Sequence, residues 1–169
     1  MTTRTVGASP ARRLAPARAQ RGGGEPAIAP VPRTPLVAAG DFGAGLPAGA
    51  VAEAIASGLR AGGWSHVDVC LLANDGVTPE LEALGFDARM RRARALVLAQ
   101  RRLAESTLQA SAAFELATRA RQAGVPCYAV TARNGLDGFD ARMLDLQLVL
   151  EAREHAALRA AGRRLARQL

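Results

Sequence analysis

The sequence contains no lysine: all 22 of its cationic side chains are arginine. This absence excludes a Walker-type phosphate-binding lysine, a Schiff-base lysine and a lysine general base. Aromatic residues are also scarce, at 4%, although 49% of the residues are hydrophobic. The core must therefore consist mainly of alanine, valine and leucine, which favours thin, alanine-rich helices packed on a sheet of valine and leucine.

Cysteines and long apolar segments are rare as well. Cys70 and Cys127 form no CxxC motif and have no histidine cluster near them, so the spacing of a metal site is absent. This usage predicts buried thiols in a reducing compartment, and hence a cytoplasmic protein. No stretch approaches the run of about 18 apolar residues that a membrane-spanning helix needs, and no apolar segment follows the first arginines as in a secretory signal. We therefore expect no membrane partner.

Charge is distributed unevenly along the chain. Residues 1–33 hold six arginines, one acid and five prolines, whereas the remaining residues hold sixteen arginines and fourteen acids, a net charge of only +2. This composition predicts a disordered Arg/Pro/Gly-rich tail over residues 1–33 and one domain over residues 34–169. Binding of nucleic acid by the tail is an open alternative, although such tails are more often simply disordered.

Short apolar runs alternate with amphipathic segments through the rest of the chain. The runs predict strands at 35–40, 66–72, 95–99, 126–131 and 144–150, and the segments predict helices at 47–62, 78–85, 105–123 and 152–168. This alternation predicts an α/β fold of right-handed βαβ units. The simplest arrangement is a single flavodoxin-like, doubly wound sheet of five parallel strands in the order 2-1-3-4-5.

Two expectations about the core follow from this arrangement. Helical spacing predicts that the first helix buries Val51, Ile55 and Leu59, and that the last helix buries Leu158, Ala161 and Leu165. Cys70 and Cys127 lie three strand spacings apart, about 14 Å at roughly 4.8 Å each. They are therefore too far apart to form a disulfide.

Ligands of such sheets bind in the loops after the carboxyl ends of the strands. After the first strand, Gly43 and Gly45 belong to a glycine-rich loop that either admits a phosphate or simply makes a tight turn. After the third strand, Arg101 and Arg102 are candidates to bind a phosphate or carboxylate, or are solvated loop residues. After the fourth strand, Asn134-Gly135 predicts a turn. Neither histidine is expected to serve as the base of a nucleophile, because His66 enters a predicted strand and His155 lies on the last predicted helix.

Several segments, in this order, are similar to those of the type I glycerate kinases. They include Leu46–Arg60, Leu84–Asp87, Arg119–Pro126 and Asn134–Asp137. The resemblance covers most of residues 35–168 and implies the flavodoxin-like domain of an enzyme that phosphorylates glycerate with ATP and Mg²⁺. Family members carry a second α/β domain inserted in the chain. Here residues 66–76 lead directly to Leu84–Asp87, so we expect the inserted domain to be absent.

The sequence departs from the family at its functional positions. In the DSFKGS-like loop, Gly40 stands at the aspartate and Gly43 at the lysine, with Asp41 one position away. In the LADGGEGT-like motif, Asn74 replaces the aspartate and Asp75 lies beside it. Asp41 and Asp75 are therefore only weak candidates for the roles of these carboxylates.

The motif after the third strand, GEGRLDxQTxxGK in the family, is altered as well. Arg102 and Thr107 match it, while the family's glutamate, aspartate and lysine are replaced by Gln100, Ala104 and Ser111. Phosphoryl transfer relies on positioned cations and on carboxylates that hold a metal. We therefore expect a glycerate kinase-like protein that is catalytically degenerate and acts as a binding or regulatory module.

Two alternatives remain open besides the degenerate enzyme. One is an active glycerate kinase that a partner chain completes, with ATP and Mg²⁺ as cofactors. The other is a nucleic-acid binder that uses its arginine-rich tail. Glycerate and ATP are the candidate small ligands, and association with a second copy or with another chain is open.

Overall fold

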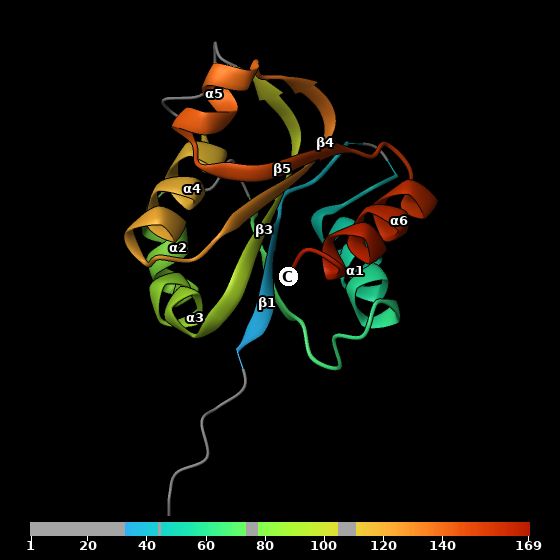
Figure 1. Cartoon of the computed structure of the whole chain (residues 1–169), viewed down its shortest axis with the longest axis horizontal. Coiled ribbons are helices and arrows are strands. Elements are labelled where there is room, and N and C mark those ends of the chain that lie inside the picture. The colour runs from blue at the N-terminus through green and yellow to red at the C-terminus, as the bar shows by residue number, and fades with distance from the viewer. Residues whose placement is uncertain (1–32, 44, 74–77, 105–110) are drawn as a thin grey trace, which may run out of the picture. The chain divides into compact units, whose positions relative to one another are not determined.

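A computed structural model describes residues 33–43, 45–73, 78–104 and 111–169 (Figure 1). The tail predicted over residues 1–33 therefore lies outside the described residues, apart from Arg33. So do Asn74, Asp75 and Thr107.

A sheet of five parallel strands forms the centre of the described part (Figure 1). Its strands lie in the order β2-β1-β3-β4-β5, so both the predicted fold class and the predicted strand order are confirmed. Their bounds are β1 Thr34–Ala39, β2 Asp68–Leu71, β3 Ala93–Ala104, β4 Cys127–Gly135 and β5 Leu146–Glu151. Because all the strands are parallel, their carboxyl ends meet at one edge of the sheet.

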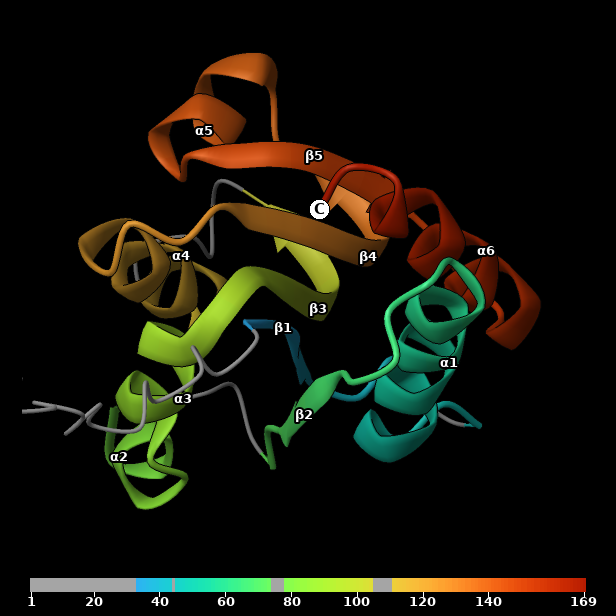
Figure 2. The same cartoon turned by 60° about the horizontal axis from the view of Figure 1, so that its bottom comes forward.

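Helices cover both faces of this sheet (Figure 2). One face carries α1 (Ala48–Ala61) and α6 (His155–Ala166), and the other carries α2 (Thr78–Ala83), α3 (Phe86–Arg92) and α4 (Ala112–Gln122). A short helix, α5 (Gly138–Met143), connects β4 to β5 and buries none of its residues. The sheet thus separates two apolar cores.

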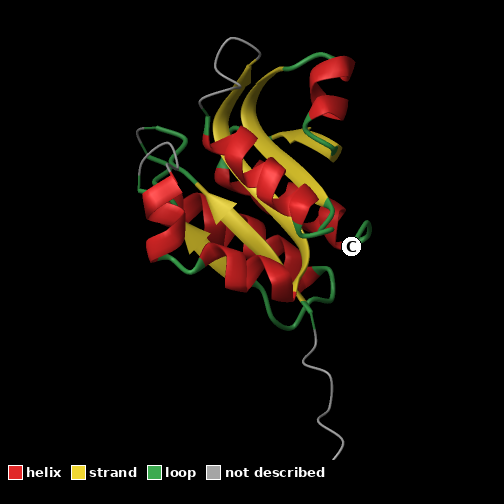
Figure 3. Cartoon of the chain, turned by 90° about the vertical axis from the view of Figure 1, so that its left-hand side faces the viewer, coloured by secondary structure: helices red, strands yellow, loops and turns green. Residues whose placement is uncertain are grey.

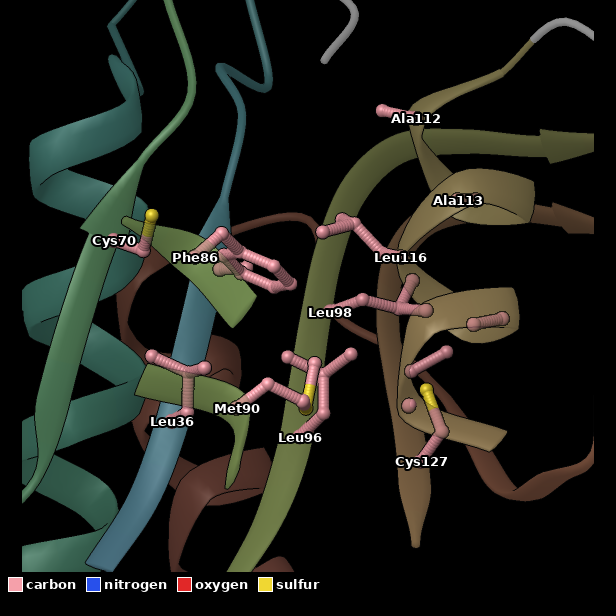
Figure 4. Close-up of a cluster of buried hydrophobic side chains, with 14 of the residues drawn as sticks. Leu36, Cys70, Phe86, Met90, Leu96, Leu98, Ala112, Ala113, Leu116 and Cys127 are labelled. Atoms are coloured by element: carbon pink, nitrogen blue, oxygen red, sulfur yellow. The ribbon is translucent and has the colours of Figure 1, made fainter. Parts of the chain in front are cut away.

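The core under α2, α3 and α4 contains both cysteines (Figure 4). Cys70 lies on β2 and Cys127 on β4, with β1 and β3 between these strands, and both thiols are free and buried. Phe86 and Met90 of α3 and Leu116 of α4 fill the space over the sheet. The absence of a Cys70–Cys127 disulfide is therefore confirmed.

The core under α1 and α6 depends on close approach of the two helices. The six residues predicted to face inward from α1 and α6 are all buried. The helices cross at Gly58 and Gly162, where an added Cβ atom would collide with a backbone carbonyl oxygen of the other helix, that of Arg159 or of Ile55. Only glycine permits this approach, because any larger side chain would separate the helices.

The structure differs from the sequence-based prediction at several elements. Helix α4 begins at Ala112 and not at 105, because the Ser111 hydroxyl caps it by accepting the Phe114 N–H at 3.3 Å. Strands β3 and β4 run on through the segments predicted as loops, so Asn134-Gly135 is strand and not turn. Helices α3 and α5 were not among the predicted helices. The capping box of α5 at Asp137 and Asp140 explains how so short a segment forms a helix.

Replacing Gly58 by alanine should destabilise the protein, because the new methyl group meets the backbone of α6. We expect a loss of about 1–3 kcal/mol in the free energy of unfolding, as for overpacked cores, measured by urea denaturation. Gly49→Ala, on the exposed side of the same helix with only Leu71 within 4 Å of the new atom, is the matched control and should not destabilise. Equal stability of the two variants would contradict the close crossing.

The buried thiols should make stability fall in alkaline solution. Burial raises the pKa of Cys70 and of Cys127. Below the unfolded-state pKa of about 8.5, the thiols are protonated in both states and the folded protein keeps its full free energy of unfolding. As pH rises above that value, the free energy of unfolding falls, because only the unfolded chain releases the thiol protons.

We expect a decline of up to about 1.4 kcal/mol per pH unit for each thiol above pH 9. Urea denaturation at pH 7.5 and pH 10, with a reducing agent present, measures it. In the Cys127→Ala variant, the free energy of unfolding should fall less between pH 7.5 and pH 10 than in the unaltered protein. An unchanged decline in Cys70→Ala/Cys127→Ala would show that the thiols are not its cause.

Candidate functional site

A cleft of about 1080 Å³ lies at the carboxyl edge of the sheet. Every strand contributes to it, either from its last residues or from the residues that follow. Its polar side chains are those of Asp41, Gln100, Arg101, Arg102, Arg133 and Arg153. This is the edge at which ligands of open α/β sheets bind. Arg101 and Arg102, predicted as site residues, therefore line the cleft, as does Asp41.

The cleft is strongly cationic. It holds four guanidinium groups against the one carboxylate of Asp41. Among the described residues, Arg101, Arg102 and Arg133 have no acidic partner, whereas Arg153 lies 3.6 Å from Glu151. Such a surface attracts anions, and guanidinium groups bind carboxylates and phosphates through paired hydrogen bonds.

Arg102 and Arg133 are neighbours because β3 and β4 continue past the strands beside them. The last partner of β1 on β3 is Ala99, and the last partner of β5 on β4 is Thr131. Beyond these points β3 and β4 pair only with each other, and Arg102 faces Arg133 in register. Figure 3 shows the two strands curving away beyond the rest of the sheet. We call residues 102–104 and 133–135 the β3–β4 extension.

Thr131 fixes the base of this extension. It is the only polar residue that is fully buried in the described part of the chain. The Thr131 Oγ1 lies 3.2 Å from the carbonyl oxygen of Arg101 and 3.1 Å from that of Arg133, so its one hydroxyl hydrogen is shared between these two acceptors. The same oxygen accepts the Arg133 N–H at 3.3 Å. One side chain thus joins the backbones that carry two of the cleft arginines.

The outer side of the extension is held by side chains where β5 has ended. Glu151 accepts the backbone N–H of Asn134 at 3.0 Å, and the Arg153 Nε donates to the carbonyl oxygen of Ala132 at 2.9 Å. These two bonds replace the backbone pairing that a longer β5 would supply. They also hold Arg153 at the wall of the cleft.

The glycine loop after β1 is closed by its own hydrogen bonds. The Asp41 carboxylate accepts the Gly43 N–H at 3.0 Å, Phe42 donates to Leu46, and Leu46 donates to Gly43. Gly43 and Gly45 both have positive φ angles, of 100° and 91°. The loop is therefore a tight turn, as one of the two sequence interpretations has it. Three of its N–H groups are already used within it and are not free to bind a phosphate.

Two side chains of β3 occupy the space beside this loop. A Cβ atom on Gly40 would lie 3.3 Å from the Gln100 Oε1, and one on Gly43 would lie 3.3 Å from the Arg101 Cζ. The Gln100 amide therefore lies between the ends of β1 and β3, where the strand order reverses. Its Nε2 is buried and has no hydrogen-bond partner among the described residues.

The described part of the cleft offers one carboxylate for a metal ion, that of Asp41, which also accepts the Gly43 N–H. Mg²⁺ is usually held by one or two carboxylates together with substrate phosphates and water. Within the described ranges, no group of three or more His, Cys, Asp or Glu side chains could hold a metal ion. Ala104 ends β3, and Ser111 caps α4.

Sequence reasoning missed Arg133 and Arg153 as site residues. Arg133 was expected in a loop, whereas it pairs with Arg102 in a continuous ladder. Arg153 lies within the range predicted for the last helix, 152–168, whereas that helix begins at His155. Each arginine follows the buried part of a strand, which is the signal that could have drawn attention to it.

Comparison with known proteins yields no relative from which a function could be transferred. No protein-family model matches the chain, and no curated protein matches it in sequence. None of the described helices is both long and apolar enough to cross a membrane.

Removing the Thr131 hydroxyl should destabilise the base of the extension. We expect Thr131→Val to cost about 1–3 kcal/mol, because buried carbonyl groups lose a donor. Thr131→Ser keeps the hydroxyl and should cost less. Urea denaturation of both variants measures the difference, and a valine variant at least as stable as the serine variant would contradict the role of the hydroxyl.

Proposed function

We propose that this protein is a non-catalytic relative of the type I glycerate kinases that binds a small organic anion such as glycerate. The ligand lies in the cleft at the carboxyl edge of the sheet, and the protein acts as a binding or regulatory module. The observation that carries the proposal is the set of three cleft arginines, Arg101, Arg102 and Arg133, that have no acidic partner among the described residues.

Charge and hydrogen bonding support an anionic ligand. A guanidinium group presents a planar fork that matches a carboxylate or a phosphate. Arg102 and Arg133 are exposed and lie on adjacent strands, within reach of one bound group. Thr131 lies buried beneath them and shares its hydroxyl hydrogen between the backbones of both strands. The cleft thus combines a rigid base with free cationic side chains.

The same surroundings argue against phosphoryl transfer. That reaction needs cations placed around the phosphates, a metal held by carboxylates and an oriented nucleophile. In the described part of the cleft, Asp41 holds the turn, and Gln100 and Gly40 stand where the resemblance puts carboxylates. Removing a single stabilising donor from a catalytic site commonly costs a factor of about 100–1,000 in rate.

Calorimetry with D-glycerate and a coupled kinase assay test the proposal on the full chain. We expect saturable binding of D-glycerate and no turnover with ATP, Mg²⁺ and D-glycerate. Arg102→Gln should weaken binding about tenfold or more, as for a lost hydrogen bond to a charged group. Arg121→Gln, on α4 near the opposite edge of the sheet, removes the same charge and should bind normally.

Three results would overturn the proposal. Turnover that Arg102→Ala abolishes would make the protein an active kinase. Turnover only when another chain is added would make it an enzyme that the other chain completes. Absence of D-glycerate binding would remove glycerate as the ligand.

A further inference from the structure

We infer that the ligand of the cleft carries at least two negative charges on separate groups, as in a dicarboxylate or a phosphorylated acid. This inference rests on the proposed anion-binding function and narrows it to a class of ligand. The observations behind it are the number of arginines in the cleft, their placement, and the size of the cleft.

The first observation is the charge that needs to be balanced. The four arginines and Asp41 that line the described cleft have a net charge of +3, that is, four minus one. Glu151, 3.6 Å from Arg153, lowers this net charge to +2. A ligand with one negative charge would therefore leave the cleft cationic, whereas a ligand with two would balance its charge.

The second observation is that the arginines are spread over different parts of the cleft. Arg102 and Arg133 form a pair in register on adjacent strands, about 4.8 Å apart at the backbone. The Arg101 guanidinium lies against Gly43, in the loop after β1. The Arg153 side chain is held at the carbonyl oxygen of Ala132. One carboxylate pairs with one or two guanidinium groups, so a second anionic group is needed to engage the others.

The pair of Arg102 and Arg133 strengthens this argument. Like charges in register on neighbouring strands destabilise a sheet, and no acidic side chain of the described residues lies between them. The extension nonetheless continues for two more paired residues, through Leu103 and Ala104. An anionic group bound between the two guanidinium groups would turn this repulsion into attraction.

The third observation is volume. The cleft, at about 1080 Å³, lies slightly above the range of roughly 300–1,000 Å³ found for sites of small ligands. A three-carbon acid would fill only a small part of it. The cleft has room for a second anionic group beside the first.

Calorimetry on the full chain with three probes tests the inference. The probes are D-glycerate, tartronate and 2-phosphoglycolate. Tartronate is also a three-carbon hydroxy acid but has a second carboxylate, and 2-phosphoglycolate has a phosphate in its place. We expect at least one of the two multiply charged probes to bind tenfold or more tightly than D-glycerate, and this advantage to shrink as salt is raised from 50 to 300 mM.

Variants identify which arginines provide the advantage. Arg133→Gln and Arg101→Gln should each reduce the preference for the multiply charged probe about tenfold, as for one lost charged hydrogen bond. Arg121→Gln should leave the preference unchanged. Thermal melting without ligand checks that each variant is folded, and Arg133→Lys should restore part of the preference.

The outcomes separate this inference from the proposed function. Equal binding of all three probes would overturn the requirement for two anionic groups and leave the anion-binding function intact. Tight binding of tartronate or 2-phosphoglycolate without D-glycerate would support the inference and reject glycerate as the ligand. A preference for tartronate over 2-phosphoglycolate would assign the class as dicarboxylates, and the reverse preference as phosphorylated acids. Absence of binding by every probe would overturn both.

Discussion

The continued pairing of β3 with β4 is the constraint on which the candidate site depends. The ladder places Arg102 beside Arg133 at a distance that strand geometry alone sets. Flexible loops in the same positions would let the two guanidinium groups separate to reduce their repulsion. Because Thr131 joins the backbones of both strands from beneath, the arginines project from a base that resists this separation. The electrostatic character of the cleft is thus a consequence of backbone hydrogen bonding.

The β3–β4 extension also marks the limit of what the sequence predicts. Apolar runs alternate clearly with amphipathic segments in the part of the chain that forms the two cores. The strand order, the buried faces of α1 and α6 and the separation of the cysteines therefore follow from the pattern alone. Alternation ends at Gln100 and at Thr131, and arginine and asparagine are not strand formers. Beyond Gln100 and Thr131, each strand is stabilised by hydrogen bonds to the backbone of the other strand. The residues of one strand do not show which other strand will lie beside it. Arg133 was missed for this reason, whereas Arg153 was missed because the last helix begins at His155 and not at residue 152.

Substitutions that are distant in the sequence are neighbours in space. Gly40 lies against the Gln100 amide, and Gly43 lies against the Arg101 guanidinium. A side chain at either glycine would compete for volume with its partner on β3. The residues at positions 40 and 43 and those at positions 100 and 101 are therefore physically coupled, because the small residues of one segment accommodate the larger residues of the other. An aspartate introduced at position 40 alone would lie against an amide that already occupies the space.

The contact between Gly58 and Gly162 has a consequence for biosynthesis. The two residues belong to the first and the last helices of the described domain, and four of the five strands, β2 to β5, lie between them in the chain. The face of the sheet under α1 cannot be fully covered until α6 has emerged from the ribosome. A chain growing at roughly 5–20 residues per second therefore exposes that apolar face for several seconds. During this interval the nascent domain depends on chaperones or on its own α1 for protection, and its final closure takes place after translation of the last helix.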